Sequence, residues 1–252
     1  MELQVDQLEI GYAGKKVATA DQLHLKTGRL TGIIGINGSG KSTLLKTLQG
    51  NLKPIQGKIN IDTKPITDYK QAELAKKISI VSSQPDVSGA LQVDEIISLG
   101  RQPYTDWLGR LTKTDQKIVD DAIKTLQINE LKHRYFNQLS DGQKQRVMIA
   151  RAFAQDTPFI LLDEPVTHLD LYHQAIVFDL LKTISHQKNK AVIFSSHQIN
   201  EILDICDDLI IIIDGKMRQN TVDHWLQDDQ LNHLFPSDYI QFDGNTKRFR
   251  FR

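Results

Sequence analysis

The chain has 252 residues, with 31 Lys and Arg against 31 Asp and Glu, so its formal net charge is zero. This balance argues against a nucleic-acid-binding protein that works through bulk positive charge. The single cysteine, Cys206, excludes an intramolecular disulfide framework and a multi-cysteine zinc site. The start MELQVDQLEI lacks the features of a signal peptide, and the longest aliphatic run, 209–213, is far shorter than a membrane span. We therefore expect a soluble protein that contacts membranes only peripherally.

Short apolar, β-rich runs alternate with helical stretches along the chain. Three of the runs, FILLD, AVIFS and LIIII, are nearly all apolar, which is typical of strands buried on both faces of a parallel sheet covered by helices. An α/β fold is therefore predicted. The strands are predicted at 3–10, 30–35, 58–61, 78–81, 159–163, 191–195 and 209–213, and the helices at 41–49, 115–126, 142–155, 171–187 and 199–206.

Two parts of the chain differ from this alternation. The stretch from about 84 to 155 is mostly helical in pattern, and we expect it to form an inserted helical lobe. The tail YIQFDGNTKRFRFR alternates apolar and polar residues on both sides of Asp243-Gly244, which predicts a β-hairpin without a chemical role.

The most specific motif follows the run LTGII and fits G-x-x-x-x-G-K-[ST] at every fixed position. Glycines in such a loop let successive backbone N–H groups point at phosphates, and the following helix N-terminus adds partial positive charge. A glycine-rich turn before a helix is the alternative, and the strand and helix that flank the motif argue against it. The predicted phosphate loop consists of Gly35, Ile36, Asn37, Gly38, Ser39, Gly40, Lys41, Ser42 and Thr43.

The strand FILLDE ends on two carboxylates, Asp163 and Glu164. Ligands of open α/β sheets bind beyond the carboxyl ends of strands. Asp163 suits a magnesium contact, and Glu164 suits polarisation of the water that attacks a γ-phosphate. The same residues would also make an ordinary polar turn before a proline. The phosphate loop elsewhere in the chain favours the functional interpretation.

Upstream of these carboxylates, the segment LSDGQKQR at 139–146 opens a predicted helix. Taken alone, it is a helix start with a serine N-cap and a glycine that exposes backbone. It also resembles the LSGGQ signature of the ATP-binding cassette (ABC) family. Asp141 replaces the second-position glycine, while Ser140, Gly142 and Gln143 match the signature.

The resemblance to the ABC family covers nearly the whole chain, with the motifs in the family's order. It implies an α/β fold: a P-loop NTPase core of RecA-like type, an N-terminal antiparallel β subdomain and an inserted α-helical signature subdomain. We expect one ATPase domain over 1–252, with its core at about 1–84 and 156–225. The helical subdomain is expected at about 85–155 and a C-terminal extension at about 226–252.

Single residues also match family positions. Tyr12 in GYAGKKV matches the aromatic residue that stacks on adenine, and Gln84 in SSQPD matches the glutamine that joins core and helical lobe. His197 in FSSHQ matches the switch histidine that contacts the γ-phosphate. Asp170 ends the THLD loop that follows the strand carboxylates. Each also has a purely structural interpretation, such as a surface tyrosine, a loop amide or a histidine at a strand end.

The resemblance implies ATP and Mg²⁺ as the bound groups. The metal would lie at Ser42, Gln84 and Asp163, and the catalytic residues would be Glu164, His197 and Gln84. Nucleotide contacts would come from Tyr12, Asp170, the phosphate loop and, on a neighbouring cassette, Ser140, Gly142 and Gln143. Because this chain has one phosphate loop and one signature, the resemblance implies a head-to-tail homodimer with two ATP molecules between the subunits.

Two uses of ATP compete for this chain: energising a membrane transporter, and acting as a soluble cassette on ribosomes or DNA. Ribosome-type members usually carry two cassettes, and DNA-repair members interrupt the cassette with a long coiled coil that is missing here. The neutral charge also disfavours nucleic acid as a partner. We therefore expect separate permease subunits, an indirectly coupled substrate-binding protein, and a peripheral location on the cytoplasmic face of the membrane.

The expected cargo rests on the segment ISLGRQPYTDWLGRL at 97–111 and on HLDLYHQ at 168–174. Both resemble cassettes that serve importers of iron-siderophores, haem and cobalamin. An amphipathic surface segment with a Gly/Pro turn is the alternative. We expect iron-chelate import, with haem or cobalamin import as the alternatives, and Leu99, Tyr104 and Trp107 as groups that face a partner.

Overall fold

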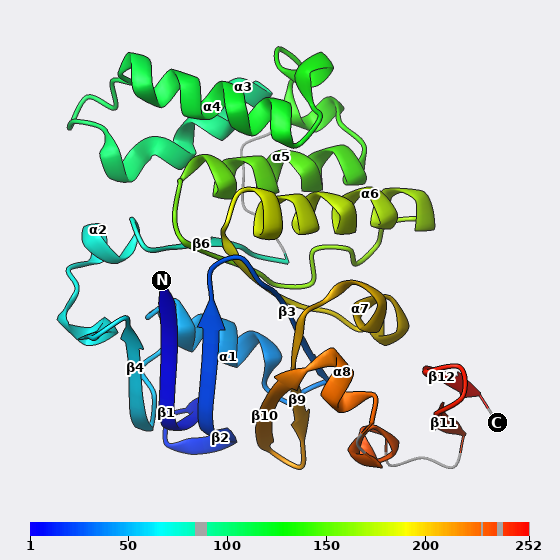
Figure 1. Ribbon diagram of the computed structural model, residues 1–252. Coiled ribbons are helices and arrows are strands. Elements are labelled where there is room, and N and C mark those ends of the chain that lie inside the picture. Colours follow the sequence, from blue (N-terminus) through cyan, green and yellow to red (C-terminus); the bar gives the residue numbers. More distant parts are fainter. Residues whose placement is uncertain (84–89, 228, 236–238, 252) are drawn as a thin grey trace.

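The computed structural model describes residues 1–83, 90–227, 229–235 and 239–251 (Figure 1). Within these residues, ten strands form one mixed sheet in the order β5-β4-β1-β2-β10-β9-β3-β8-β7-β6. The strands are β1 (Glu2–Tyr12), β2 (Lys15–Lys26), β3 (Leu30–Gly35), β4 (Gln56–Ile61), β5 (Lys64–Pro65), β6 (Ile78–Val81), β7 (Phe159–Leu162), β8 (Ala191–Ser195), β9 (Asp208–Ile213) and β10 (Lys216–Thr221).

The parallel half of the sheet contains β6, β7, β8, β3 and β9. All four residues of β7 and all five of β8 are buried, as the apolar runs predicted. In the register of these strands, Leu162 of β7 lies opposite Phe194 of β8, and Ile33 of β3 lies opposite Ser195. The carboxyl ends of β3, β7 and β8 therefore meet at one edge of the sheet.

The N-terminal half is antiparallel, as expected. β1 pairs with both β2 and β4, and β10 joins this half to the parallel half through β9. β2 and β10 were not predicted. Only one face of β2 is buried, mainly through Ala18, Ala20, Leu23 and Leu25, so its pattern lacks a long apolar run.

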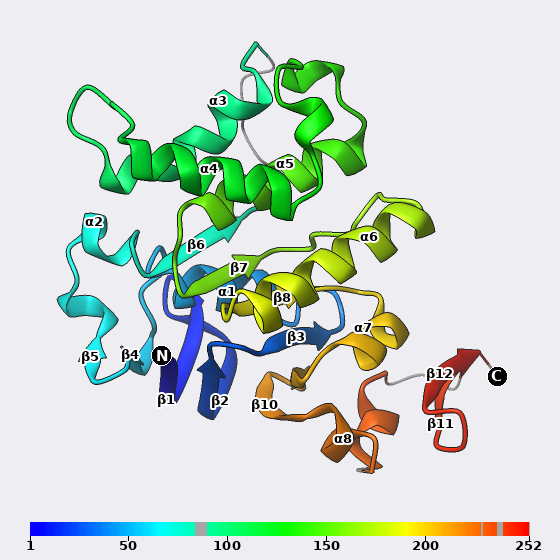
Figure 2. The same cartoon turned by 45° about the horizontal axis from the view of Figure 1, so that its top comes forward.

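The helices lie on both faces of the sheet and above its edge (Figures 1 and 2). All five predicted helices are confirmed to within two residues at each end when the π-helical turn after α6 is counted with that helix. The short helices α2, α3 and α8 were not predicted. The helices are α1 (Lys41–Leu48), α2 (Gln71–Leu74), α3 (Val93–Ser98), α4 (Lys113–Thr125), α5 (Asp141–Ala154), α6 (Leu171–Lys182), α7 (Ile199–Ile205) and α8 (Val222–Trp225), with a π-helical turn at Thr183–Gln187 that continues α6.

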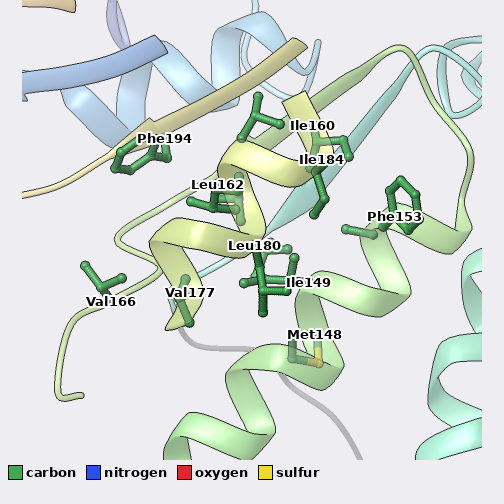
Figure 3. Packing of buried hydrophobic residues seen from close by; sticks show 14 of the residues in the cluster. Met148, Ile149, Phe153, Ile160, Leu162, Val166, Val177, Leu180, Ile184 and Phe194 are labelled. Carbon is green, nitrogen blue, oxygen red and sulfur yellow. The ribbon is translucent and has the colours of Figure 1, made fainter. Parts of the chain in front are cut away.

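The predicted helical lobe consists of α3, α4 and α5, which pack on one another. α5 also faces α6 and β7, and their side chains interlock in one apolar cluster (Figure 3). Met148, Ile149 and Phe153 come from α5, while Leu162 and Leu180 come from β7 and α6. This cluster anchors the lobe to the sheet.

A buried ion pair ties the lobe together internally. Arg101 Nε donates to Asp115 Oδ1 at 2.9 Å, and its Nη1 donates to the carbonyl oxygen of Ala154 at 2.9 Å. A Cβ atom at Gly100 would collide with the carbonyl oxygen of Arg151 on α5. Within the segment 97–111, Gly100 and Arg101 therefore contribute to the packing of the lobe.

The predicted C-terminal hairpin is confirmed as β11 (Ile240–Asp243) and β12 (Arg248–Phe251), with a four-residue turn between the paired ends Asp243 and Arg248. It is paired separately from the main sheet and lies beside α7 (Figure 2). Asn200 of α7 binds both backbone polar groups of Phe249, at 2.8 and 3.2 Å.

Across the part of the chain that the structure describes, none of the helices combines the length and the hydropathy needed to span a membrane.

Candidate functional site

The phosphate loop lies between β3 and α1, as its sequence predicts. Gly38 and Gly40 have φ values of 78° and 109°, a left-handed backbone region that glycine adopts readily. Lys41 is the first residue of α1, and its Nζ donates to the carbonyl oxygens of Gly35 and Ile36 at 2.9 and 3.2 Å. The lysine therefore closes the loop into a ring with its ammonium group on the inside.

Burial lowers the pKa of Lys41, and the nearby carboxylates of Glu164 and Asp163 raise it by less. Because a buried cation is costly without compensating charge, the Lys41 ammonium group favours binding of an anion in the loop. The Oγ of Ser39 is also buried, with no hydrogen-bond partner among the described residues. Both observations fit a loop shaped to receive phosphate oxygens.

One hydrogen bond joins the phosphate loop to the strand carboxylates. Ser42 Oγ donates to Asp163 Oδ1 at 3.0 Å, across 121 positions of the chain. Asp163 directly follows β7, so the parallel sheet brings it beside the first turn of α1. The two residues predicted to share a metal are therefore neighbours.

Glu164 is held at three points. Its Oε1 contacts His197 Nε2 at 2.7 Å, and its Oε2 accepts a hydrogen bond from Thr167 Oγ1 at 3.1 Å. Its backbone N–H donates to Ser195 Oγ at 2.9 Å. The φ of Glu164 is 52°, a left-handed conformation that is unfavourable for a residue with a Cβ atom. The sheet edge thus orients this carboxylate through several contacts at once.

Tyr12 lies at the end of β1 with a 47% exposed side chain. It pairs with Lys15 at the start of β2, and Val17 of the same strand contacts the position where a Cβ of Gly40 would lie. The β1–β2 turn therefore places an exposed aromatic ring on the strand pair that borders the phosphate loop. Gln84 lies outside the described residues, and its role stays a prediction.

The signature residues form a second group. Ser140 caps α5: its Oγ accepts from the Gln143 N–H at 3.3 Å, and its own N–H donates to Gln143 Oε1 at 3.1 Å. A Cβ at Gly142 would lie 2.6 Å from the ring of His173 on α6. Asp170 caps α6 and accepts from the His173 N–H at 2.8 Å.

Backbone and side-chain hydrogen bonds from His173 lower the pKa of Asp170. Thus the predicted Ser140, Gly142, Gln143 and Asp170 come together at the facing starts of α5 and α6. The second cluster, the Glu164 group, consists of Glu164 and its contacts Thr167, Ser195 and His197. Among the described residues, no hydrogen bond or ion pair joins the signature residues and Asp170 to the Glu164 group.

The sequence analysis did not identify two of the contacts of Glu164, those with Ser195 and Thr167. The signal for Ser195 was a hydroxyl residue ending a strand that is otherwise apolar.

Comparisons with known proteins identify the family of the chain. A family model described as "ABC transporter" matches residues 19–167. The petrobactin import ATP-binding protein FpuC of Bacillus anthracis is 36% identical over 228 residues, which cover 90% of this chain and 84% of that protein. The cobalamin import ATP-binding protein BtuD of Halobacterium salinarum is 31% identical over 86% of this chain and 54% of that protein.

Among solved structures, a transporter described as of the metal-chelate type, in an inward-facing conformation, matches with a TM-score of 0.79 and 31% identity. The match covers 92% of this chain and 88% of that chain. ATPases of this family dimerise and pair with permease subunits. The fold, the phosphate loop and these matches together show that the chain belongs to the ABC transporter family, as an ATP-binding subunit that hydrolyses ATP to drive transport.

Proposed function

We propose that this chain hydrolyses ATP at the edge formed by β3, β7 and β8 and thereby energises a membrane importer of iron chelates of the siderophore type. The hydrogen bond between Ser42 and Asp163 carries the site assignment, because it joins a phosphate-binding loop to two carboxylates from a distant strand. The contact between Glu164 and His197 supports an acid–base role for this pair in the same cluster.

In this proposal, the loop at 35–43 binds the phosphates, with Lys41 supplying the positive charge. Glu164 orients and polarises the attacking water, and His197 contacts the γ-phosphate. Tyr12 stacks on the adenine, and Gln84 links the site to the helical lobe. The chain then forms one ATPase domain whose core and helical lobe follow the boundaries expected from the sequence.

Mg²⁺ fits the residues present. The Ser42 hydroxyl and the Asp163 carboxylate are oxygen donors of the kind that magnesium prefers, and they lie 3.0 Å apart. We propose that they hold the ion together with Gln84. When bound, the metal would neutralise charge on the phosphates.

The partners follow from the lack of direct bonds between the two groups. Because no hydrogen bond or ion pair among the described residues joins Ser140, Gly142, Gln143 and Asp170 to the Glu164 group, we propose that they complete the site of a second copy of the chain. The chain would dock on transmembrane permease subunits at the cytoplasmic face of the membrane, with a substrate-binding protein coupled through them. A cleft of about 850 Å³ between α2, the segment 49–54 and the end of α5 suits this contact. Its walls carry Leu52, Tyr69, Leu74, Ile80, Met148 and Arg151.

Iron-chelate cargo is supported by the similarity to FpuC, a petrobactin import protein, and the similarity to BtuD, a cobalamin import protein, supports cobalamin as the alternative. Haem remains the third candidate. In the segment 97–111, Leu99 and Trp107 are 43% and 91% exposed and so are open to a partner. Tyr104 is half-buried, with its ring against the Arg101 guanidinium at 4.0 Å, so it supports the lobe.

The test is uptake in cells that lack this chain's gene. Cells complemented with the wild-type chain or with Glu164→Gln would be given a radiolabelled ferric siderophore, haem or cobalamin in parallel. We expect restored siderophore uptake with the wild type only. Restored cobalamin or haem uptake alone would transfer the proposal to that cargo. Unchanged uptake of all three in the deletion strain would contradict the import proposal and favour a cassette that works away from transporters.

A further inference from the structure

The last residue of β8, Ser195, sits between the two strands that carry the site. β8 pairs with β3, which leads into the phosphate loop, and with β7, which leads into Asp163 and Glu164. The residue is completely buried, with 0% of its surface exposed. A polar side chain in such a position is costly unless its hydrogen bonds are satisfied.

The Ser195 hydroxyl donates one hydrogen bond and accepts another. Ser195 Oγ donates to Asp163 Oδ1 at 2.7 Å and accepts from the Glu164 N–H at 2.9 Å. A hydroxyl carries one proton and two lone pairs, so it is among the few small groups that donate and accept at a single atom. The side chain thereby links the carboxylate of one functional residue to the backbone of the next.

The hydrogen bond from Ser195 helps to fix which carboxylate oxygen of Asp163 is bonded within the protein. Ser42 Oγ and Ser195 Oγ both donate to Oδ1, at 3.0 and 2.7 Å. Among the described residues, Oδ2 takes no hydrogen bond. Two donors on one oxygen set the rotation of the carboxylate, and the other oxygen stays available for a metal-bound water.

The bond to Glu164 fixes the backbone where it is least favourable. A left-handed φ of 52° is unfavourable for a residue with a Cβ atom. The N–H of that same residue is the one that Ser195 accepts. The direction in which the Glu164 side chain leaves the chain, toward His197 and Thr167, therefore depends on this bond.

We propose that Ser195 is a positioning residue for ATP hydrolysis, which sets the rotation of Asp163 and the backbone of Glu164 through one hydroxyl. This role rests on the proposed function of the site. Ser195 touches neither nucleotide nor attacking water in this scheme and acts only through its two neighbours. It follows that the hydroxyl matters for turnover and for the metal dependence, and little for ATP affinity.

The experiment compares variants of the full chain at position 195. Ser195→Ala removes the hydroxyl, while Ser195→Thr and Ser195→Val add nearly the same bulk and differ from each other mainly in that hydroxyl. Ser185→Ala is the matched control, since Ser185 is also fully buried but, among the residues that the structure describes, its hydroxyl bonds only to the Lys182 carbonyl. The measurements are kcat, the ATP concentration and the Mg²⁺ concentration at half-maximal rate, ATP affinity without metal, and thermal unfolding.

We expect Ser195→Ala to lower kcat about tenfold to a hundredfold, as for loss of a hydrogen bond to a charged group. The half-saturating Mg²⁺ concentration should rise, while metal-free ATP affinity stays within about threefold of the wild type, a difference below 1 kcal/mol. Ser195→Thr should exceed Ser195→Val in kcat even if the extra methyl group harms both.

Equal rates for the Thr and Val variants, or wild-type kcat in Ser195→Ala, would overturn the role of Ser195 and leave the ATPase assignment intact. An equal loss in Ser185→Ala would also overturn it, because the effect would then be general to buried serines. Absence of Mg²⁺-dependent hydrolysis by the wild type would instead overturn the proposed site.

Discussion

Glu164 and His197 lie 33 residues apart in the chain, and their side chains meet at 2.7 Å between Oε1 and Nε2. They meet because Glu164 follows β7 and His197 follows β8, and these two strands are parallel neighbours in the sheet. The residue proposed to orient the attacking water is thus in contact with the residue proposed to contact the γ-phosphate. Both side chains are partly exposed, at 25% and 42%, and are accessible to a ligand.

The first prediction concerns Glu164→Gln, which keeps the shape of the side chain and removes its charge. We expect turnover to fall about 10²–10⁴-fold, the usual contribution of a general base, while ATP binding persists. The ATP-bound variant should then accumulate as a dimer, visible by gel filtration with ATP. Glu130→Gln, a surface change of the same chemistry, is the control and should behave as the wild type. A Glu164→Gln protein that stays monomeric and still hydrolyses ATP would contradict the assignment.

The second prediction concerns Lys41→Ala. The ammonium group is held inside the loop by the Gly35 and Ile36 carbonyl oxygens, so its removal deletes the charge that faces a phosphate. We expect ATP affinity to weaken about tenfold to a hundredfold, as for loss of charge-assisted hydrogen bonds. Titration with ATP measures it, and Lys46→Ala on the exposed face of α1 provides the control. Unchanged affinity in Lys41→Ala would refute the phosphate-loop assignment.

How far the sequence predicts this fold depends on where each strand is buried. β7, β8 and β9 lie inside the sheet, and their uninterrupted apolar runs identify them without further information. β10 also lies inside the sheet, yet Met217 is its only buried residue, and the polar pattern KMRQNT conceals it. Its position is decided by pairing with β9, a tertiary contact that no local pattern reports.

The site shows the same division. The motifs predicted that Ser42, Asp163, Glu164 and His197 act together, and the structure brings these four within one hydrogen-bonded cluster. Ser195, which links them, belongs to no motif of its own. Its proximity to Asp163 follows from the register between β7 and β8, and register is set by the packing of the whole sheet.

The third prediction concerns the buried pair of Arg101 and Asp115. Burial raises the pKa of Asp115, but hydrogen bonds from Thr112 and Arg101 lower it by more, so the net direction is down. Because Asp115→Asn leaves Arg101 buried without a counter-charge, we expect a loss of about 3–5 kcal/mol in the free energy of unfolding. Thermal and chemical unfolding measure it. Asp120 lies on the same helix, is itself exposed and pairs with the partly exposed Lys132, so Asp120→Asn should cost about 0–1 kcal/mol.

This pair also predicts a pH dependence. Since the pKa of Asp115 is lower in the folded chain, its stabilisation is present above the unfolded value of about 3.9. It is lost as the pH falls through the folded pKa. The difference in unfolding free energy between wild type and Asp115→Asn should therefore shrink below about pH 4. A difference that stays constant into acid would show that the carboxylate charge is not what Arg101 requires.

The last prediction separates two roles of Gly142. A Cβ at this position would lie 2.6 Å from the His173 ring, so Gly142→Ala must displace that ring from its place beside Asp170. Any loss of ATPase activity could then arise from packing alone. The double variant Gly142→Ala/His173→Ala removes the collision and should recover thermal stability relative to Gly142→Ala. Because the backbone of Gly142 is also proposed to face the nucleotide of a second copy, we expect activity to remain low, compared with His173→Ala as the control. Full recovery of activity in the double variant would show that the glycine serves only the packing of α5 against α6.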